Sequence, residues 1–138
     1  MNPLAANGSG GLSRPGNGGK FPRSVRLLRH ADFERVYKQG RRHFAAHLTV
    51  FYLPRPVNEN AAEGGRVGFT VSKVLGGAVV RNRMKRRLRE AVRLHGTVPA
   101  SMDIVINPKK SLLAAAWVEV QREVRRAFEV IAKAAEKS

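Results

Sequence analysis

The chain contains no cysteine among its 138 residues. This absence excludes disulfide bonds, thiolate zinc sites and cysteine nucleophiles, and it fits a reducing cytosol, so the sequence predicts a cytoplasmic protein. Long apolar runs are also missing. None approaches the roughly 20 residues of a membrane span, and the N-terminus lacks the apolar core of a signal peptide. We therefore expect no membrane partner.

Acidic residues are scarce as well. Ten Asp and Glu stand against 26 Lys and Arg, which gives a formal net charge of +16. Such an excess of like charge repels itself and is typical of proteins that bind a polyanion, most often nucleic acid. Because hydrophobic residues make up 43% of the chain, wholesale disorder is excluded and a folded core is expected.

The motifs of a self-contained catalytic centre are missing too. The sequence has no phosphate-binding loop of the GxxxxGK[ST] type, no zinc-ligand spacing and no nucleophile motif. The four histidines are scattered, and none has a carboxylate partner at an obvious spacing. We expect a binding protein with no catalytic residue, no metal or cofactor of its own and no small-molecule substrate.

Hydrophobic spacing divides the chain into a tail and one domain. Residues 1–24 are rich in Gly, Pro, Asn and Ser and predict a flexible tail, whereas 25–138 predict a single domain. Within it, Phe33, Val36 and Tyr37 share one helical stripe that Gly40 ends. Strands are predicted at 48–53, 66–73 and 102–107, with a short edge strand at 41–46. A helix is expected over 78–95, and Ser111 is expected to cap a long final helix.

The order of these elements is α-β-β-β-α-β-α. Strand 66–73, helix 78–95 and strand 102–107 have the form of a crossover between two parallel strands. The fold class expected is α/β, an α+β sandwich with one small mixed sheet of about four strands and helices packed on it.

The helix at 78–95 is strongly basic. Six of the ten residues from Arg81 to Glu90 are Arg or Lys, yet Val80, Met84, Leu88 and Ala91 form one apolar stripe. A disordered basic tail has no need of such a stripe, so a folded helix is predicted. Between residues 64 and 110, eleven basic residues face only two acids, so local ion pairs cannot neutralise the helix. These features favour contact with nucleic acid.

Gly76 and Gly77 precede this helix. Two glycines allow the backbone to approach a ligand closely, and the first amides of the helix can hold a phosphate. A tight strand-to-helix turn without a ligand explains the pair equally well.

Three aromatic residues predict a second surface. Phe33 and Tyr37 project from the first helix, and Phe51 lies on the strand face opposite Val50 and Tyr52. Gly68, Thr70 and Ser72 share a strand face that is too polar for a core. An open face of this kind can hold an unstacked single strand. The alternative is that the three aromatics pack the first helix onto the sheet.

Several segments in order resemble the protein component of bacterial ribonuclease P. They are VSK at 71–73, GGA at 76–78 and RNR at 81–83, with LLRHADFERVYKQGRR before them and DIVINPKKS after them. The resemblance covers roughly residues 25–130. It implies a rare left-handed crossover through the basic helix, against the usual right-handed rule. It also makes 25–138 an RNA-binding domain.

The resemblance further implies a function in tRNA processing. A catalytic RNA, with its Mg²⁺ ions, removes the 5′ leader from precursor tRNA, and the protein binds both the leader and the RNA. The residues that match the leader-binding cleft are Phe33, Tyr37, Thr49, Phe51 and Lys73. The residues that match the RNA-docking segment are Arg81, Asn82, Arg83, Lys85, Arg86 and Arg89, with Gly76 and Gly77 as the turn that approaches a phosphate.

Two positions depart from the family pattern. Gly77 stands where an Asn is usual, which removes a side-chain hydrogen bond at the turn, and Tyr37 replaces a common Phe, which keeps an aromatic face. Two other functions are considered: a ribosomal or other structural RNA-binding protein without an enzymatic partner, and an architectural DNA-binding protein.

Overall fold

The computed structural model describes residues 29–55, 65–99 and 101–136, so the predicted tail at 1–24 lies outside the described residues. The helices and strands are α1 (His30–Gln39), β1 (Arg41–Phe44), β2 (Leu48–Pro54), β3 (Arg66–Phe69), α2 (Ala78–His95), β4 (Met102–Pro108) and α3 (Trp117–Glu136), with short 3₁₀ turns η3 (Lys73–Leu75) and η4 (Lys110–Ala114). This order confirms the predicted one. None of the described helices has the length and apolar character needed to cross a bilayer.

The strands form one mixed sheet in the order β1-β2-β4-β3. β1 pairs with β2, and β2 with β4, in antiparallel fashion, whereas β3 and β4 run parallel with Val67 opposite Ile104. α2 therefore connects two parallel neighbours, which confirms the predicted crossover. Its left hand stays an implication of the family resemblance.

The main core lies on one face of the sheet, beneath α2 and α3. Strand alternation directs Val50, Val67, Ile104 and Ile106 toward this face, where each is at most 1% exposed. The helices complete the core with residues that recur every three or four positions and are buried in the same cluster: Met84, Leu88, Ala91 and Val92 of α2, and Val120, Val124, Ala127, Phe128 and Ile131 of α3. The apolar stripe predicted for the helix at 78–95 is thus confirmed at Met84, Leu88 and Ala91, with Val80 partly buried against the same core.

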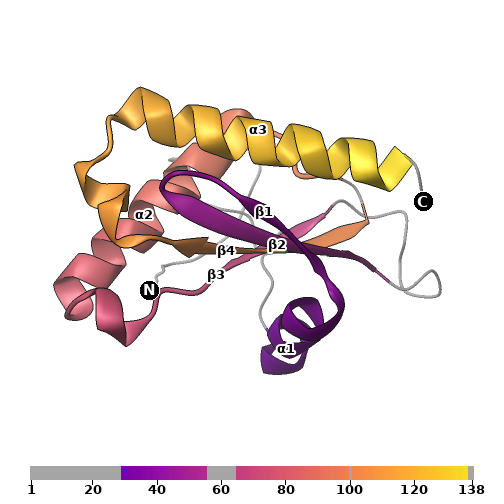
Figure 1. Ribbon diagram of the computed structural model, residues 1–138, viewed down its shortest axis with the longest axis horizontal. Coiled ribbons are helices and arrows are strands. Elements are labelled where there is room, and N and C mark those ends of the chain that lie inside the picture. The colour runs from indigo at the N-terminus through magenta and orange to yellow at the C-terminus, as the bar shows by residue number, and fades with distance from the viewer. Residues whose placement is uncertain (1–28, 56–64, 100, 137–138) are drawn as a thin grey trace, which may run out of the picture.

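The opposite face of the sheet carries α1, as Figure 1 shows by the placement of α1 and α3 on different sides of the strands. A second, smaller apolar cluster joins them: Val36 of α1 and Val105 of β4 are fully buried, with Phe33, Phe51 and Leu53 packed around them. Because α1 has only ten residues, it spans only part of the sheet. On the side of β1 this face is less covered, and Phe44 there is 65% exposed.

A buried ion cluster fixes the position of α1. Asp103 of β4 is fully buried, and Arg66 of β3 donates two hydrogen bonds to its carboxylate at 2.8 and 2.9 Å. Arg35 of α1 donates to the same carboxylate, and Asp32 lies 3.7 Å from Arg35 and 3.8 Å from Arg66. The cluster therefore links the first helix to two strands that lie far from it in the sequence.

The connection before α3 differs from the prediction. Ser111 does not cap the final helix, because η4 and a bend separate it from α3, which begins at Trp117. Arg87 of α2 stabilises this break by donating hydrogen bonds to the carbonyl oxygens of Leu112, Leu113 and Ala115, which a continuous helix would use internally. The hydroxyl of Ser111 instead lies 2.7 Å from Nδ1 of His47.

Two histidines make the stability of the fold depend on pH. Burial is the largest cause that lowers the pKa of His43 and of His95. Arg126 lowers that of His43 further, against a weaker opposing effect of Glu123, whereas Glu129 opposes the shift of His95 more strongly than Arg125 adds to it. The unfolded chain therefore binds more protons near the ordinary histidine pKa of about 6.5. Stability should rise as the pH rises through this value and fall as the pH drops below it.

The urea midpoint of the full chain should consequently be higher at pH 7.5 than at pH 5.5. A double variant, His43→Gln with His95→Gln, should show a smaller difference between the two pH values. If the double variant kept the whole difference, these two side chains would not be its source.

Candidate nucleic-acid interface

The three aromatic residues predicted for the second surface lie together between α1 and the sheet. The rings of Tyr37 and Phe51 meet edge to face with their centroids 4.8 Å apart. Tyr37 is 37% exposed, and its hydroxyl donates a hydrogen bond to Oδ1 of Asn107 at 3.1 Å. Phe33 and Phe51 are half-buried against Val36 and Val105. These rings therefore pack α1 onto the sheet and also present aromatic surface beside it.

The polar residues predicted for this surface are more widely spread. Thr49 pairs with Phe44 of β1 and with Asn107 of β4. Because Thr49 lies two residues before Phe51, the two side chains share one face of β2. Lys73 is exposed on η3, after β3, and β4 separates β3 from β2. Gly68, predicted on an open face, is buried opposite Val105, because α1 and the ion cluster occupy this side of the sheet. That part of the prediction is wrong.

Two further residues on β1 extend the aromatic surface. Phe44 is 65% exposed, and the guanidinium carbon of Arg42 lies 5.8 Å from the centroid of its ring and 5.9 Å from that of Phe51. Arg42 and Phe44 alternate along β1 and so share the face of Phe51, which is paired with Arg42. The edge strand predicted at 41–46 contains both residues, but the pairing of β1 with β2 is needed to assign them to this face.

α2 presents the predicted basic surface. Its buried stripe turns the basic residues outward, and Asn82, Arg83 and Arg86 are exposed. Lys85, Arg81 and Arg89 are half-buried. Arg81 also has a local role, because its Nε donates to the carbonyl oxygen of Gly76 at 3.1 Å and so holds the turn before the helix. The predicted docking residues thus all lie on one helix. Arg81 also stabilises the turn before it, whereas Arg83 and Arg86 are more exposed.

The turn before α2 places its two glycines in different conformations. Gly76 has a φ of +149°, and a Cβ there would lie 3.0 Å from Cβ and Cγ1 of Val80. Gly77 is the N-cap of α2 with an extended backbone (φ −75°, ψ −177°), no side-chain capping bond, and open space where a Cβ would be. The turn therefore requires glycine at position 76 but not at 77.

Substitutions at these glycines should act in opposite directions. Gly77→Asn should raise the free energy of unfolding by a few tenths of a kcal/mol, because an Asn side chain can cap the first amides of α2. Gly76→Asn should lower it by more than about 1 kcal/mol through backbone strain and the contact with Val80. Urea denaturation measures both, and destabilisation of equal size in the two variants would contradict this assignment.

Acidic side chains and a histidine also meet at positions that sequence spacing did not reveal. His47, Glu119 and Glu123 bring potential metal-ligating atoms within 4.8 Å of one another. The amide of His47 donates to Glu123 Oε1 at 3.0 Å, which ties the β1–β2 turn to α3. His30 and Glu34, four residues apart on α1, approach to 3.5 Å, so the prediction that no histidine has a carboxylate partner at an obvious spacing was wrong.

Known proteins are similar to this chain in both sequence and fold. A family model described as Ribonuclease P matches residues 21–132, the described domain almost entirely. The chain belongs to the ribonuclease P protein family. It is 46% identical over 91 residues to the ribonuclease P protein component of Oleidesulfovibrio alaskensis, which covers 65% of this chain and 70% of that protein. The corresponding protein of Citrifermentans bemidjiense is 40% identical over 108 residues, covering 78% and 89%.

Solved structures agree with this assignment. The ribonuclease P protein of Staphylococcus aureus matches with a TM-score of 0.65 and 26% identity, covering 78% of this chain and 94% of the other. The four-stranded mixed sheet with three helices is therefore the fold of the ribonuclease P protein family. The chain is the protein subunit of ribonuclease P, the accessory subunit of an endoribonuclease that acts on tRNA precursors, and its RNA partner is ribonuclease P RNA.

Proposed function

We propose that this subunit contributes two separate RNA-binding surfaces to ribonuclease P. One is the leader cleft, which we define as Phe33, Tyr37, Thr49 and Phe51 with Arg42 and Phe44 at its β1 side. The other is the docking face, the exposed basic side of α2. Lys73, on η3 after β3, is proposed to meet the leader where it continues from the cleft toward the catalytic RNA.

The contact of Tyr37 with Phe51 is the observation that carries leader binding. A partly exposed aromatic pair beside a guanidinium offers the stacking surface and the positive charge that single-stranded RNA needs. The core helices α2 and α3 lie on the other face of the sheet, so they do not cover this pair. We accordingly assign the 5′ leader of precursor tRNA to this face.

The charge and exposure of α2 support docking on ribonuclease P RNA. Its apolar stripe is buried in the core, and Arg83 and Arg86 on the outward side are exposed to solvent. Phosphate contacts by such cations release counterions. In this proposal the catalytic centre and its Mg²⁺ ions belong to the RNA, the protein supplies no catalytic residue and no cofactor site, and the cytoplasmic location stays a prediction.

Reconstitution tests the proposal directly. The full chain is added to a bacterial ribonuclease P RNA at low Mg²⁺ concentration, and cleavage is followed for precursor tRNAs with leaders of one and about eight nucleotides. The protein should stimulate cleavage of both and should tighten binding of the longer leader selectively. Stimulation without any dependence on leader length would overturn leader binding, and no stimulation of either substrate would overturn the functional pairing with this RNA.

Docking through α2 predicts a change in salt dependence. Arg83→Ala should weaken binding to ribonuclease P RNA and reduce the slope of log K against log salt by about 0.7–0.9, the value for one phosphate contact. Lys133→Ala on α3 removes the same charge from another exposed position and is the matched control. Affinity is measured by filter binding over a series of salt concentrations. An unchanged slope in Arg83→Ala, or an equal change in the control, would count against a local phosphate contact.

A further inference from the structure

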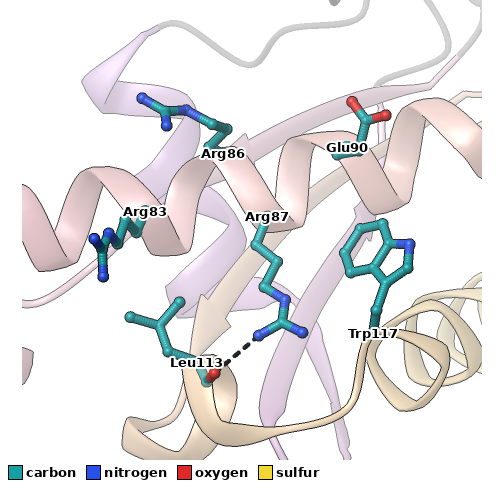
Figure 2. A pocket seen from close by; sticks show the side chains of 6 residues that line it. All are labelled: Arg83, Arg86, Arg87, Glu90, Leu113 and Trp117. Carbon is teal, nitrogen blue, oxygen red and sulfur yellow. Dashed lines mark hydrogen bonds between the residues drawn. The ribbon is translucent and has the colours of Figure 1, made fainter.

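A hollow lies beside the docking face, between α2 and the connection that leads to α3. Its volume is about 430 Å³, within the range of roughly 300–1,000 Å³ typical of ligand pockets. Residues from both sides line it: Arg83, Arg86, Arg87 and Glu90 of α2, and Leu113 and Trp117 across from them. We call these six residues the Trp117 pocket, and Figure 2 shows them.

Arg87 and Trp117 form a fixed platform inside this pocket. Nη1 of Arg87 donates hydrogen bonds to the carbonyl oxygens of Leu112 and Leu113, at 3.1 and 3.0 Å. Its Nη2 donates to the carbonyl oxygen of Ala115 at 2.7 Å. The guanidinium carbon lies 5.6 Å from the centroid of the Trp117 ring, and Figure 2 shows the two side chains next to each other between α2 and the start of α3. Because the groups that accept these hydrogen bonds are neutral carbonyls, Arg87 adds positive charge beside a half-buried indole.

The charge of the pocket favours an anion. Its one acid, Glu90, is engaged by Arg93, which donates from Nε at 3.1 Å and again from Nη2. Arg83 and Arg86 are exposed, and neither forms a hydrogen bond or an ion pair with the part of the chain that the structure describes. Two guanidinium groups without a partner among the described residues therefore line a hollow that also contains an indole.

Only some ligands combine the two properties that this pocket offers. An indole binds flat, apolar rings by stacking, and guanidinium groups bind phosphate with two parallel hydrogen bonds. A nucleotide has both a flat base and a phosphate. An unpaired nucleotide in RNA presents its base for such stacking, whereas a base inside a duplex does not.

We propose that the Trp117 pocket binds one unpaired nucleotide of ribonuclease P RNA, with its base on the indole of Trp117 and its phosphate at Arg83 and Arg86. This site is distinct from the leader cleft, because α1 and α3 lie on opposite sides of the sheet. It rests on the proposed docking role of α2 and adds to it a contact that distinguishes single-stranded from paired RNA.

The fluorescence of Trp117 provides a direct test, because it is the chain's single tryptophan. The full chain is titrated at low salt with a five-nucleotide oligoadenylate and, separately, with a short RNA duplex. The single strand should quench the emission in a saturable way, and the duplex should quench it much less. No quenching by the single strand, or equal quenching by both, would overturn the proposal.

Charge variants test the phosphate position in the same titration. The double variant Arg83→Gln/Arg86→Gln should need at least about tenfold more oligoadenylate for half-maximal quenching. A second double variant, Arg122→Gln/Lys133→Gln, lowers the net charge equally at exposed positions of α3 outside the pocket and should behave like the unmodified chain. Equal weakening in both double variants would show a general charge effect and would overturn the assignment of phosphate to this pocket.

Two conservative replacements separate stacking from packing. Trp117→Phe and Trp117→Leu both keep an apolar side chain against the core, but only Phe keeps an aromatic face. Binding to ribonuclease P RNA should be about tenfold weaker for Leu than for Phe, the effect of one stacked base. Equal affinities would overturn the pocket while leaving docking intact. If the Arg83→Gln/Arg86→Gln variant instead bound this RNA normally, the docking role of α2 itself would be wrong.

Discussion

Replacing Asp103 by Asn should lower the free energy of unfolding by about 3–5 kcal/mol, the effect of removing one partner from a buried ion pair. Asn has nearly the same shape as Asp, so the substitution removes charge without creating a cavity. Arg35 and Arg66 would lose the carboxylate they both bind, and the buried Arg55, whose Nε lies 4.0 Å from Oδ1, would lose a nearby negative charge. Of the two carboxylates in this cluster, only Asp32 would remain to balance the charges of Arg35, Arg55 and Arg66.

This loss is a substantial fraction of the free energy of unfolding of a small domain, which is typically about 5–15 kcal/mol. Asp103→Asn is therefore expected to leave the fold marginal. Because Arg35 belongs to α1, the variant should also loosen this helix from the sheet and disturb the leader cleft before the core beneath α2 and α3 is lost. Amide hydrogen exchange should show faster exchange in α1 than in α2 in this variant.

An exposed ion pair provides the control for Asp103. Glu90 and Arg93 are partly exposed neighbours on α2, with 45% and 34% of their side chains accessible, so Glu90→Gln should change stability by less than about 1 kcal/mol. Both variants are compared by urea denaturation at pH 7. A loss of less than 1 kcal/mol for Asp103→Asn would mean that the cluster does not hold the structure together in the manner described.

Short-range patterns account for what could be predicted of this fold. The bounds of α2 and its buried residues Met84, Leu88 and Ala91 follow from spacing within 18 residues, and the bounds of β4 follow from its apolar run. The docking residues could be placed on one helix for the same reason. For the aromatic residues of the leader cleft, by contrast, spacing left a binding role and a packing role open, and the family resemblance favoured binding. The structure shows that Phe33 and Phe51 do pack α1 onto the sheet.

Long-range contacts account for what the sequence did not reveal. Asp103 meets Arg35 across 68 residues, and His47 meets Ser111 across 64, so no local period indicates either contact. The sequence predicted a final helix capped by Ser111, but α3 begins only at Trp117. The hydrogen bonds that stabilise the break before it come from Arg87, which lies 25 residues or more away. Phe44 could be seen as part of a strand, but its place beside the cleft depends on the register with β2.

Replacing Phe51 by Ala should weaken binding of precursor tRNA by about 5- to 150-fold, which corresponds to the loss of about 1–3 kcal/mol of stacking for one base. The loss should depend on the leader: it should vanish for a substrate without leader nucleotides, and docking of the protein on ribonuclease P RNA should change little. Dissociation constants of the reconstituted enzyme for both substrates measure the difference. Circular dichroism of the free variant verifies that the sheet is retained.

A second variant at the same position separates stacking from packing, the two roles that the geometry of Phe51 allows. Leu fills most of the space beside Val36 and Val105 but has no aromatic face, so Phe51→Leu should preserve stability and still lose most of the leader-dependent affinity. If Phe51→Leu instead bound the leader like the unmodified protein, packing would be the role of Phe51. Stacking would then fall to Tyr37 and Phe44, whose larger exposure leaves their rings accessible to a base.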